Sequence, residues 1–444
     1  MQVLKFGGTS VGSPQRMREV ATLINNGEQK VVVLSAVSGT TNKLVALAGS
    51  LLRGEKEEAQ QRLQALQTEY EVFIQDLLPD PDLHKEGLTV LERILGTLRA
   101  GLSQEFTSRE EKIVLAQGEL LSTQLFHLYL LSQGLSSELL PALDFMRIDQ
   151  YNEPELELIQ SLLHETMEHT APADYYITQG YICLNADSEI DNLQRGGSDY
   201  TATLVGAALQ AEEVQIWTDI DGIHNNDPRV VDNTFPLRHA SYREAAELAY
   251  FGAKILHPTC VIPAEQTGVP IRLKNTMAPE APGTLISQQS SRRAIAAIAA
   301  KDNIAAIKIR SGRMFNAYGF LRRVFEVFEQ FRTPIDMITT SEVAVSLTID
   351  NLTYLEAIIG ALEPFGEVEY QLDQTIICIV GDRLHEQTGY TKRIFAALED
   401  VPLRMVSYGG SNNNISLLVH QDDKERVLQQ LQTHLFATAS AAAI

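Results

Sequence analysis

Lys5, Gly7 and Gly8 stand where an apolar run that predicts a strand gives way to the first predicted helix. Adjacent glycines let backbone N–H groups approach a phosphate closely, and the N-terminus of the following helix adds positive potential. Lys5 supplies a full positive charge, so the segment predicts a phosphate-binding turn. The same glycines would also suit a plain tight turn. It is not a Walker A loop, because Ser13 and Pro14 occupy the positions where that motif requires lysine followed by serine or threonine.

Two further turns carry polar groups next to predicted helices. Residues 35–42 follow a predicted buried strand over 30–37 and are rich in serine and threonine. Residues 195–199 contain Arg195, whose guanidinium suits a carboxylate or phosphate, and Asp199, which suits a cationic group or a metal. Because ligands collect at the carboxyl ends of parallel strands, the turns after the first two strands are expected to face one crevice. Taken alone, each turn would also serve as a loop or a helix cap.

A later part of the chain adds polar and basic groups suited to a nucleotide. Thr218 and Asp219 end a predicted strand over 214–218, and Arg229 and Lys254 follow. Each of them could be a solvated surface group. Phosphoryl transfer needs mainly the placement of charge, so these groups and the glycine-bearing turns together predict a kinase rather than a hydrolase.

The overall composition excludes several classes of protein. The 444-residue chain has a formal net charge of −21, so its average field repels nucleic acid and anionic membranes. No stretch is long and apolar enough for a membrane span, and the first residues enter a strand pattern without a targeting segment, which predicts a cytoplasmic protein. Cys183, Cys260 and Cys378 lie far apart in the sequence, which argues against a disulfide framework or a thiolate metal site.

Strand and helix patterns alternate through the first 285 residues. This alternation predicts an α/β fold with a largely parallel sheet and helices on both of its faces. The expected strands cover 3–6, 30–37, 174–178 and 214–218, and the expected helices cover 14–24, most of 42–133 with breaks near 79–81 and 101, 200–210, and 241–251.

The pattern changes after a proline-, glycine- and serine-rich boundary at residues 277–291. Strand, helix, strand, strand, helix and strand follow across 304–370, and most of that order recurs from residue 376. The residues repeat as well, since Pro334 and Ser341 correspond to Pro402 and Ser411. We expect two small split βαβ units. No final strand for the second unit is evident beyond residue 435, so the two units could share or exchange strands.

Taken in order, these motifs resemble the aspartate kinases, within the amino-acid kinase fold. Residues 338–343 and 414–416 resemble the two regulatory, ferredoxin-like ACT units of that family. The resemblance implies a kinase domain over 1–285, a first ACT unit over 295–372 and a second over 373–444. No dehydrogenase segment follows, so the chain is similar to the monofunctional, lysine-sensitive members. The strings that carry the resemblance are residues 5–11, 34–42, 117–119, 195–202, 217–219, 227–229 and 251–258.

The resemblance also implies roles for individual residues. It implies ATP and L-aspartate as substrates, with Mg²⁺ bridging the phosphates and no dedicated metal ligands in the protein. The catalytic residues would be Lys5, Arg195 and Asp199. Contacts to aspartate would come from Thr41, Glu119, Arg195 and Ser198. The nucleotide would lie against Lys5, Gly7, Gly8, Thr218, Asp219, His224, Arg229 and Lys254.

Regulation follows from the same resemblance. In lysine-inhibited relatives the effector lies between the first ACT units of two subunits, which implies a homodimer or a dimer of dimers. The second repeat has Arg404 where the first has Asp336, so the two repeats should not bind one ligand equally. A packing role at a dimer interface is the alternative for these positions. The candidate effector contacts are Met314, Phe320, Asp336 and Ser341.

The chain departs from the family pattern at a few positions. Gln194 stands where glycine is usual, residues 188–193 lack the usual threonine-rich run, and His224 replaces a common tyrosine. These departures motivate the second of two alternatives that stay open beside the aspartate kinase. One is a kinase of the same fold that acts on another small acid, and the other is a catalytically silent amino-acid sensor.

Overall fold

The structure is a computed structural model that describes residues 1–436 except 104, 194–195, 253–255, 292 and 315–317. The chain divides into two compact units. Unit 1 comprises Met1–Ile223 and Ile255–Gln289, and unit 2 comprises His224–Lys254 and Ser290–Ile444. The segment His224–Lys254 is thus grouped with the C-terminal part of the chain.

Unit 1 is built on a parallel sheet in which β1 (Gln2–Phe6) has a central place. Its apolar side chains are fully buried, which is the pattern expected for a strand covered on both faces. The strands of the unit follow one another in the order β3 (Ser137–Leu140), β4 (Tyr175–Gln179), β2 (Lys30–Leu34), β1, β7 (Val214–Thr218), β9 (Ile271–Asn275) and β10 (Thr284–Ser287). All neighbours in this series are parallel except β9 and β10, which are antiparallel.

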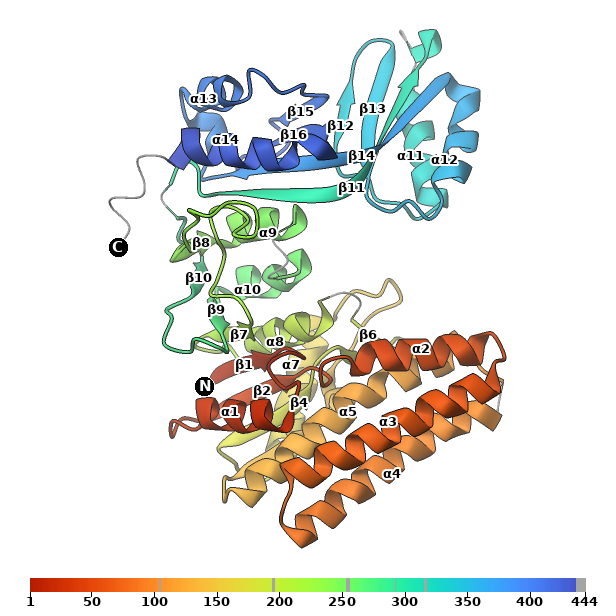
Figure 1. Cartoon of the computed structure of the whole chain (residues 1–444), viewed down its shortest axis with the longest axis vertical. Coiled ribbons are helices and arrows are strands. Elements are labelled where there is room, and N and C mark those ends of the chain that lie inside the picture. The colour runs from red at the N-terminus through yellow and green to blue at the C-terminus, as the bar shows by residue number, and fades with distance from the viewer. Residues whose placement is uncertain (104, 194–195, 253–255, 292, 315–317, 437–444) are drawn as a thin grey trace. The chain divides into compact units, whose positions relative to one another are not determined.

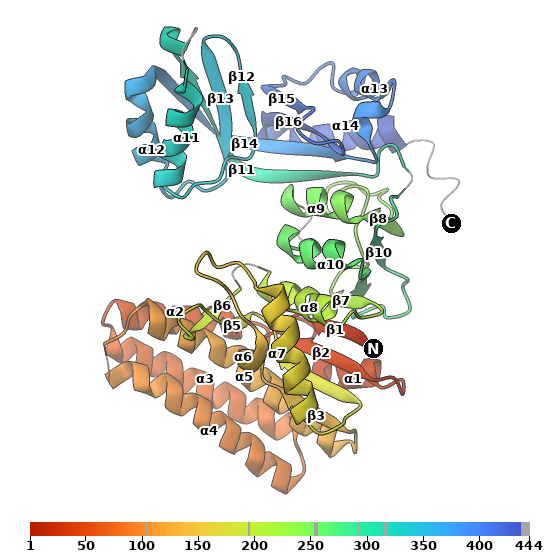
Figure 2. The ribbon, with the colours of Figure 1, turned by 180° about the vertical axis from the view of Figure 1, so that it is seen from behind.

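Helices cover both faces of this sheet (Figures 1 and 2). One face carries α1 (Pro14–Ile24) and α5 (Ser108–Ser132), and the hairpin of α3 (Lys56–Leu77) and α4 (Pro81–Ser103) packs outside them. The other face carries α8 (Gly197–Ala208), with α7 (Leu156–His169) and α10 (Val261–Thr267) beside it. The remaining elements of unit 1 are α2 (Thr40–Leu52), α6 (Ala142–Phe145), β5 (Ile182–Leu184), β6 (Ile190–Asn192) and a 3₁₀ turn at Pro258–Cys260.

Two sequence-based boundaries need correction in unit 1. The strand predicted over 30–37 ends at Leu34, because the chain turns there and Gly39 adopts a left-handed φ of 81° before α2 begins. The helix predicted over 200–210 begins earlier, at Gly197, and ends at Ala208. The first helix is as predicted, and Ser13 caps it by accepting a hydrogen bond from the Arg16 N–H.

Unit 2 contains an antiparallel sheet in the order β12 (Ile338–Thr340), β13 (Ala344–Ile349), β11 (Ala297–Arg310), β14 (Glu367–Val380), β16 (Asn414–His420) and β15 (Met405–Tyr408). The long strands β11 and β14 pair along most of their length. The helices are α9 (Tyr242–Tyr250), α11 (Phe320–Gln330), α12 (Leu355–Leu362), α13 (Tyr390–Ala397) and α14 (Lys424–Phe436). Short elements are β8 (His239–Ser241) and 3₁₀ turns at Gly312–Met314, Glu363–Phe365, Leu384–Glu386 and Gln421–Asp423.

The fourth strand of the second repeat is formed by residues that precede the first repeat in the sequence. Ala297 pairs with Val380 and Lys301 with Ile376, so the first half of β11 lies beside the second half of β14. The second half of β11 lies between β13 and the first half of β14 and belongs to the first repeat. Each repeat thus has four strands in ferredoxin-like order, and the long strands pass from one repeat into the other. Each repeat also has an apolar core of its own.

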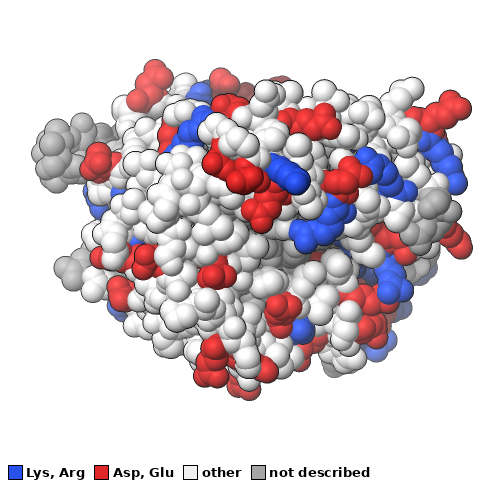
Figure 3. Space-filling view, turned by 90° about the horizontal axis from the view of Figure 1, so that it is seen from below, with Lys and Arg blue, Asp and Glu red and all other residues white. Residues whose placement is uncertain are grey.

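Acidic and basic side chains are interspersed among uncharged ones on the face shown in Figure 3. Among the residues that the structure describes, no helix combines the length and the apolar character that a membrane span requires.

Candidate active site

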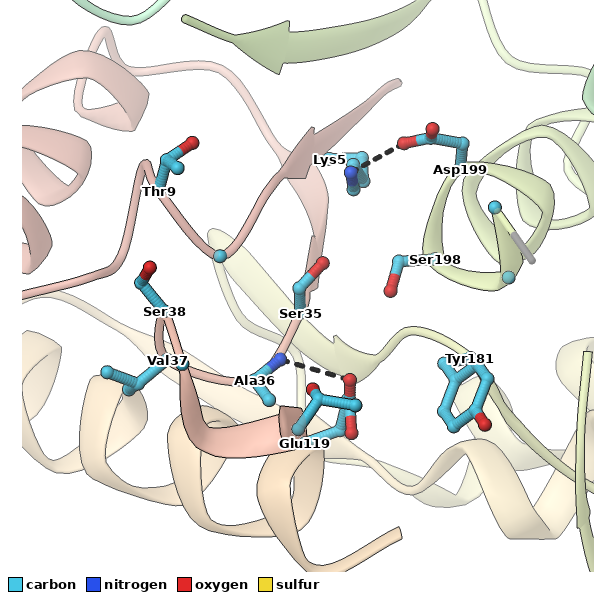
Figure 4. A pocket seen from close by; sticks show the side chains of 15 residues that line it. Lys5, Thr9, Ser35, Ala36, Val37, Ser38, Glu119, Tyr181, Ser198 and Asp199 are labelled. Carbon is cyan, nitrogen blue, oxygen red and sulfur yellow. Dashed lines mark hydrogen bonds and ion pairs between the residues drawn. The ribbon is translucent and has the colours of Figure 1, made fainter. Parts of the chain in front are cut away.

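A cavity of about 680 Å³ opens in unit 1 where β1 and β2 end (Figure 4). Both strands are parallel, so their carboxyl ends and the turns after them meet at one edge of the sheet. The first turns of α2 and α8 and the middle of α5 form further parts of the wall. The lining residues are Lys5, Gly8, Thr9, Ser35, Ala36, Val37, Ser38, Gly39, Thr41, Glu119, Tyr181, Gly196, Gly197, Ser198 and Asp199.

Lys5 and Asp199 face each other across one side of this cavity. Lys5 is the fourth residue of β1, and Asp199 lies in the first turn of α8. The Lys5 Nζ lies 2.5 Å from Asp199 Oδ1, and both side chains are largely screened from solvent. A cation and an anion therefore lie side by side in the cavity wall. Such groups can stabilise the charge of a phosphoryl group and hold its counter-ion.

The glycine turn after β1 packs tightly against the turn after β2. A Cβ atom on Gly8 would lie 2.9 Å from the carbonyl oxygen of Ala36, closer than such atoms approach in proteins. Gly7 has more space, since the nearest atom to a Cβ there would be Lys5 Nζ at 3.5 Å. The predicted crevice is therefore present, and the close approach of the two backbones explains why Gly8 has no side chain.

Glu119 reaches the cavity from the middle of α5. Its Oε1 accepts a hydrogen bond from the Ala36 N–H at 3.1 Å, and its side chain is almost fully buried. Oε2 is also buried and has no hydrogen-bond partner among the described residues. Burial raises the pKa of Glu119 to about 7, against the opposing effects of backbone hydrogen bonds and of Lys5. A buried carboxylate oxygen without a partner suits a cationic ligand group.

The sequence-based reasoning missed Tyr181, which forms another part of the wall (Figure 4). It follows the carboxyl end of β4 and has a left-handed φ of 70°, which is uncommon for a residue with a large side chain. Its ring leaves no room for a side chain at Gly197, where a Cβ would lie 2.6 Å from Tyr181 Cδ2. Its position after a parallel strand is the one signal that would have indicated it. Thr9, Ser35 and Ser38 were noted only as parts of the two turns.

The family comparisons agree with this geometry. Residues 1–275 match the model of the amino acid kinase family, and residues 377–435 match an ACT domain model. The chain is 33% identical to lysine-sensitive aspartokinase 3 of Escherichia coli, over 98% of this chain and 99% of the relative. The chain belongs to the aspartokinase family. A chloroplastic aspartokinase 3 of Arabidopsis thaliana is also 33% identical, over 100% of this chain and 83% of the relative.

Solved aspartokinase structures share the whole architecture. E. coli aspartokinase III in complex with aspartate and ADP (R-state) has a TM-score of 0.85 at 32% identity, and the match covers 98% of this chain and 100% of that one. The same enzyme in complex with lysine and aspartate (T-state) has a TM-score of 0.81, covering 98% and 99%. The predicted family, fold class and phosphotransferase class are therefore confirmed.

The structure of this aspartokinase brings together part of the predicted site. Lys5, Gly8, Thr41, Glu119, Ser198 and Asp199 line one cavity, and Gly7 belongs to the same turn. Thr218 ends β7 in unit 1 and Asp219 follows it; both lie outside the lining set, and their side chains hydrogen-bond to each other at 3.1 Å. Arg195 and Lys254 lie outside the described residues.

The other predicted nucleotide contacts belong to unit 2. His224 Nδ1 lies 3.0 Å from the Thr234 hydroxyl. The Arg229 guanidinium donates two hydrogen bonds to the carboxylate of Asp227, at 2.9 and 2.8 Å. This pairing leaves most of the Arg229 side chain exposed.

The predicted effector residues lie in the first repeat of this aspartokinase. The side chain of Asp336 is buried and paired with Lys301, so its carboxylate already has a cationic partner within the chain. Phe320 is part of the apolar core of the repeat, and Met314 packs against that core. Ser341 is exposed, and its N–H donates to the carbonyl of Ala344.

Proposed function

We propose that the chain transfers the γ-phosphoryl group of ATP to the β-carboxylate of L-aspartate. The product would be 4-phospho-L-aspartate, the first intermediate in the biosynthesis of lysine, threonine and methionine. The observation that carries this proposal is the shared cavity of Lys5, Glu119 and Asp199, in which a cation, an unpartnered carboxylate oxygen and a glycine turn line one space. Transfer between two bound anions depends mainly on such placement of charge.

Aspartate would bind on the Glu119 side of the cavity. The unpartnered Oε2 of Glu119 would accept a hydrogen bond from the ammonium group of the substrate. Thr41 and Ser198 line the same space with hydroxyl groups that suit a carboxylate. Arg195, which precedes α8, would pair with one of the two substrate carboxylates.

ATP would bind with its phosphates on the Lys5 side. The backbone at Gly8 leaves no space for a side chain, and the preceding Gly7 lies beside the Lys5 ammonium, which fits a phosphate cradle. Asp199 would lie close to the transferring group. Further nucleotide contacts would come from Gly7, Thr218, Asp219, His224, Arg229 and Lys254.

Mg²⁺ would be held mainly by the phosphates. The described residues contain no group of three or more histidine, cysteine, aspartate or glutamate side chains that could hold a metal ion. The ion would arrive with the nucleotide and would supply charge neutralisation for the phosphates.

The catalytic proposal is tested by incubating the purified protein with MgATP and a panel of small acids. We expect ADP release with L-aspartate and little with L-glutamate. Release with glutamate alone would favour another small-acid kinase of the same fold. Binding of an amino acid without turnover at any aspartate concentration would favour a silent sensor.

Regulation would act through the first ACT repeat. We propose lysine as the most suitable effector, because the candidate position Asp336 is acidic and the E. coli relative is named lysine-sensitive. Met314, Phe320 and Ser341 would be its further contacts. The assembly would be a homodimer or a dimer of dimers. Each chain would contain a kinase domain over residues 1–285 and two ACT units over residues 295–372 and 373–444. A cytoplasmic location stays a prediction from the sequence.

A further inference from the structure

A buried hydrogen-bond network joins α14, in the second repeat, to residues 224–235. The Gln432 Oε1 accepts hydrogen bonds from Asn225 Nδ2 at 3.0 Å and from Asn226 Nδ2 at 3.3 Å. Its Nε2 donates to the carbonyl of Asn233 at 3.1 Å. Asn225, Asn226 and Gln432 are each at most 3% exposed. One glutamine side chain therefore holds both arms of the loop that residues 224–235 form.

The network continues to the predicted nucleotide contacts. Asn226 Oδ1 accepts a hydrogen bond from the Asp227 N–H at 2.9 Å, and the Asp227 carboxylate holds the Arg229 guanidinium with two hydrogen bonds. On the other arm, Asn225 Oδ1 accepts from the Phe235 N–H at 2.8 Å. Asn226 Nδ2 also donates to the Leu428 carbonyl at 3.1 Å, so Gln432 and Leu428 together hold the backbone that carries Arg229 on α14.

Apolar packing alone would not fix the loop in this way. Val231 and Phe235 pack into the core of the second repeat, and the rings of Phe235 and Phe436 make an edge contact at 5.9 Å. Such contacts tolerate sliding, whereas buried amides need their partners at defined distances and angles. A polar side chain at the centre of an apolar helix face is the arrangement expected where orientation matters more than burial.

We propose that Gln432 is a positioning residue for nucleotide binding, acting through Asn225 and Asn226 on the loop that carries His224 and Arg229. The inference rests on the proposed nucleotide role of that loop. It gives a helix of the second ACT repeat, outside the residues 1–275 that match the kinase family, a role in holding this loop. Gln432 itself would touch neither substrate.

The test compares Gln432→Met, which keeps the length of the side chain but removes both amide functions, with Gln429→Met on the exposed side of the same helix. For Gln432→Met we expect the KM for MgATP to rise about ten-fold and the KM for aspartate to stay within about two-fold of the wild-type value. The Kd for ADP should rise by the same factor. Gln429→Met should change neither KM.

Folding is controlled in two ways. Circular dichroism and the Tm of each variant show whether the protein is intact, and a structural defect alone would not raise one KM selectively. Gln432→Asn keeps an amide on a shorter side chain, and we expect it to have a smaller effect on the KM for MgATP. If Gln432→Met does not fold, Gln432→Asn replaces it in the comparison of KM values.

Arg229→Ala separates failure of the inference from failure of the proposed nucleotide site. A raised KM for MgATP in both Arg229→Ala and Gln432→Met supports the inference. A rise in Arg229→Ala with none in the Gln432 variants overturns the inference and leaves the nucleotide site intact. If none of these variants alters the KM for MgATP, the proposed nucleotide role of the loop is rejected, and the inference is rejected with it.

Discussion

The Lys301 ammonium lies 2.7 Å from Asp336 Oδ1 and 2.8 Å from the carboxylate of Asp350. The Tyr250 hydroxyl donates to the same oxygen of Asp336 at 3.0 Å, and the Lys301 Nζ lies 4.4 Å from the centre of the Tyr250 ring. Burial raises the pKa of Asp336, and the pairing with Lys301 opposes that effect. Asp336 is thus part of an internal cation site, and a cationic effector that binds there has to share or replace the Lys301 ammonium.

Substitution of Asp336 tests its predicted role in feedback. We expect Asp336→Ala to keep the turnover of the uninhibited enzyme, because the residue lies in the ACT repeat, and to raise the lysine concentration for half-inhibition at least about ten-fold. Inhibition curves at fixed MgATP and aspartate give this value. The matched control is Asp350→Ala, which removes the other carboxylate from Lys301 and leaves Asp336 in place. Full inhibition by lysine in Asp336→Ala would reject the assignment.

Lys5 offers the most direct test of the active site. Lys5→Ala removes the cation that faces Asp199, so we expect kcat/KM to fall by about 100-fold or more while the fold persists. Arg195→Ala should likewise lose most activity. Lys43→Ala is the control, because Lys43 lies on the exposed side of α2 and pairs with Glu69. Steady-state rates together with Tm values decide the matter, and near-normal activity of Lys5→Ala would contradict the role of Lys5.

The part of the site that depends on strand ends could be predicted from sequence. The glycine turn after β1 and the serine-rich turn after β2 each follow an apolar run, and parallel strands necessarily bring such turns together. Tyr181 could not be found in this way. Its ring lies in the cavity wall because the Tyr181 backbone is left-handed and because Gly197 has no side chain to occupy that space. Neither feature produces a periodic pattern in the sequence.

The organisation of unit 2 was only partly predictable. Helix and strand periodicity indicated both repeats, but not that residues 297–301 close the second one, because strand pairing across a long separation is a tertiary property. The packing of residues 224–235 against α14 could not be predicted from the sequence either. It depends on three buried amides, Asn225, Asn226 and Gln432, which in sequence resemble ordinary surface residues.

Gly7 and Gly8 form a matched pair for testing the phosphate turn. Gly8→Ala places a methyl group 2.9 Å from the Ala36 carbonyl, so one of the two turns has to move. We expect kcat/KM for MgATP to fall at least about ten-fold. At Gly7 the nearest neighbour is the flexible end of Lys5 at 3.5 Å, so Gly7→Ala should stay within about three-fold of the wild type. Equal effects of the two substitutions would show that the close packing at Gly8 does not matter for nucleotide use.

Glu119 predicts a pH dependence of aspartate binding. Its pKa of about 7 means that the carboxyl group is largely protonated at pH 6 and largely ionised at pH 8. Only the ionised form attracts the substrate ammonium, so kcat/KM for aspartate should rise with pH through a midpoint near 7. Glu119→Gln is nearly isosteric and cannot ionise. We expect it to have a much lower kcat/KM for aspartate and to lack this midpoint, whereas an unchanged midpoint in the variant would assign the titration to another group.

The same pKa gives an independent prediction for stability. In the unfolded chain Glu119 ionises near its ordinary pKa of 4.5, but in the folded protein it keeps its proton up to about pH 7. The folded state therefore binds more protons than the unfolded state between these values, and the contribution of Glu119 to the free energy of unfolding falls as pH rises across that window. Glu119→Gln lacks this contribution. Urea unfolding at pH 5 and pH 8 should therefore show a smaller loss of stability for Glu119→Gln than for the wild type, and an equal loss would contradict the raised pKa.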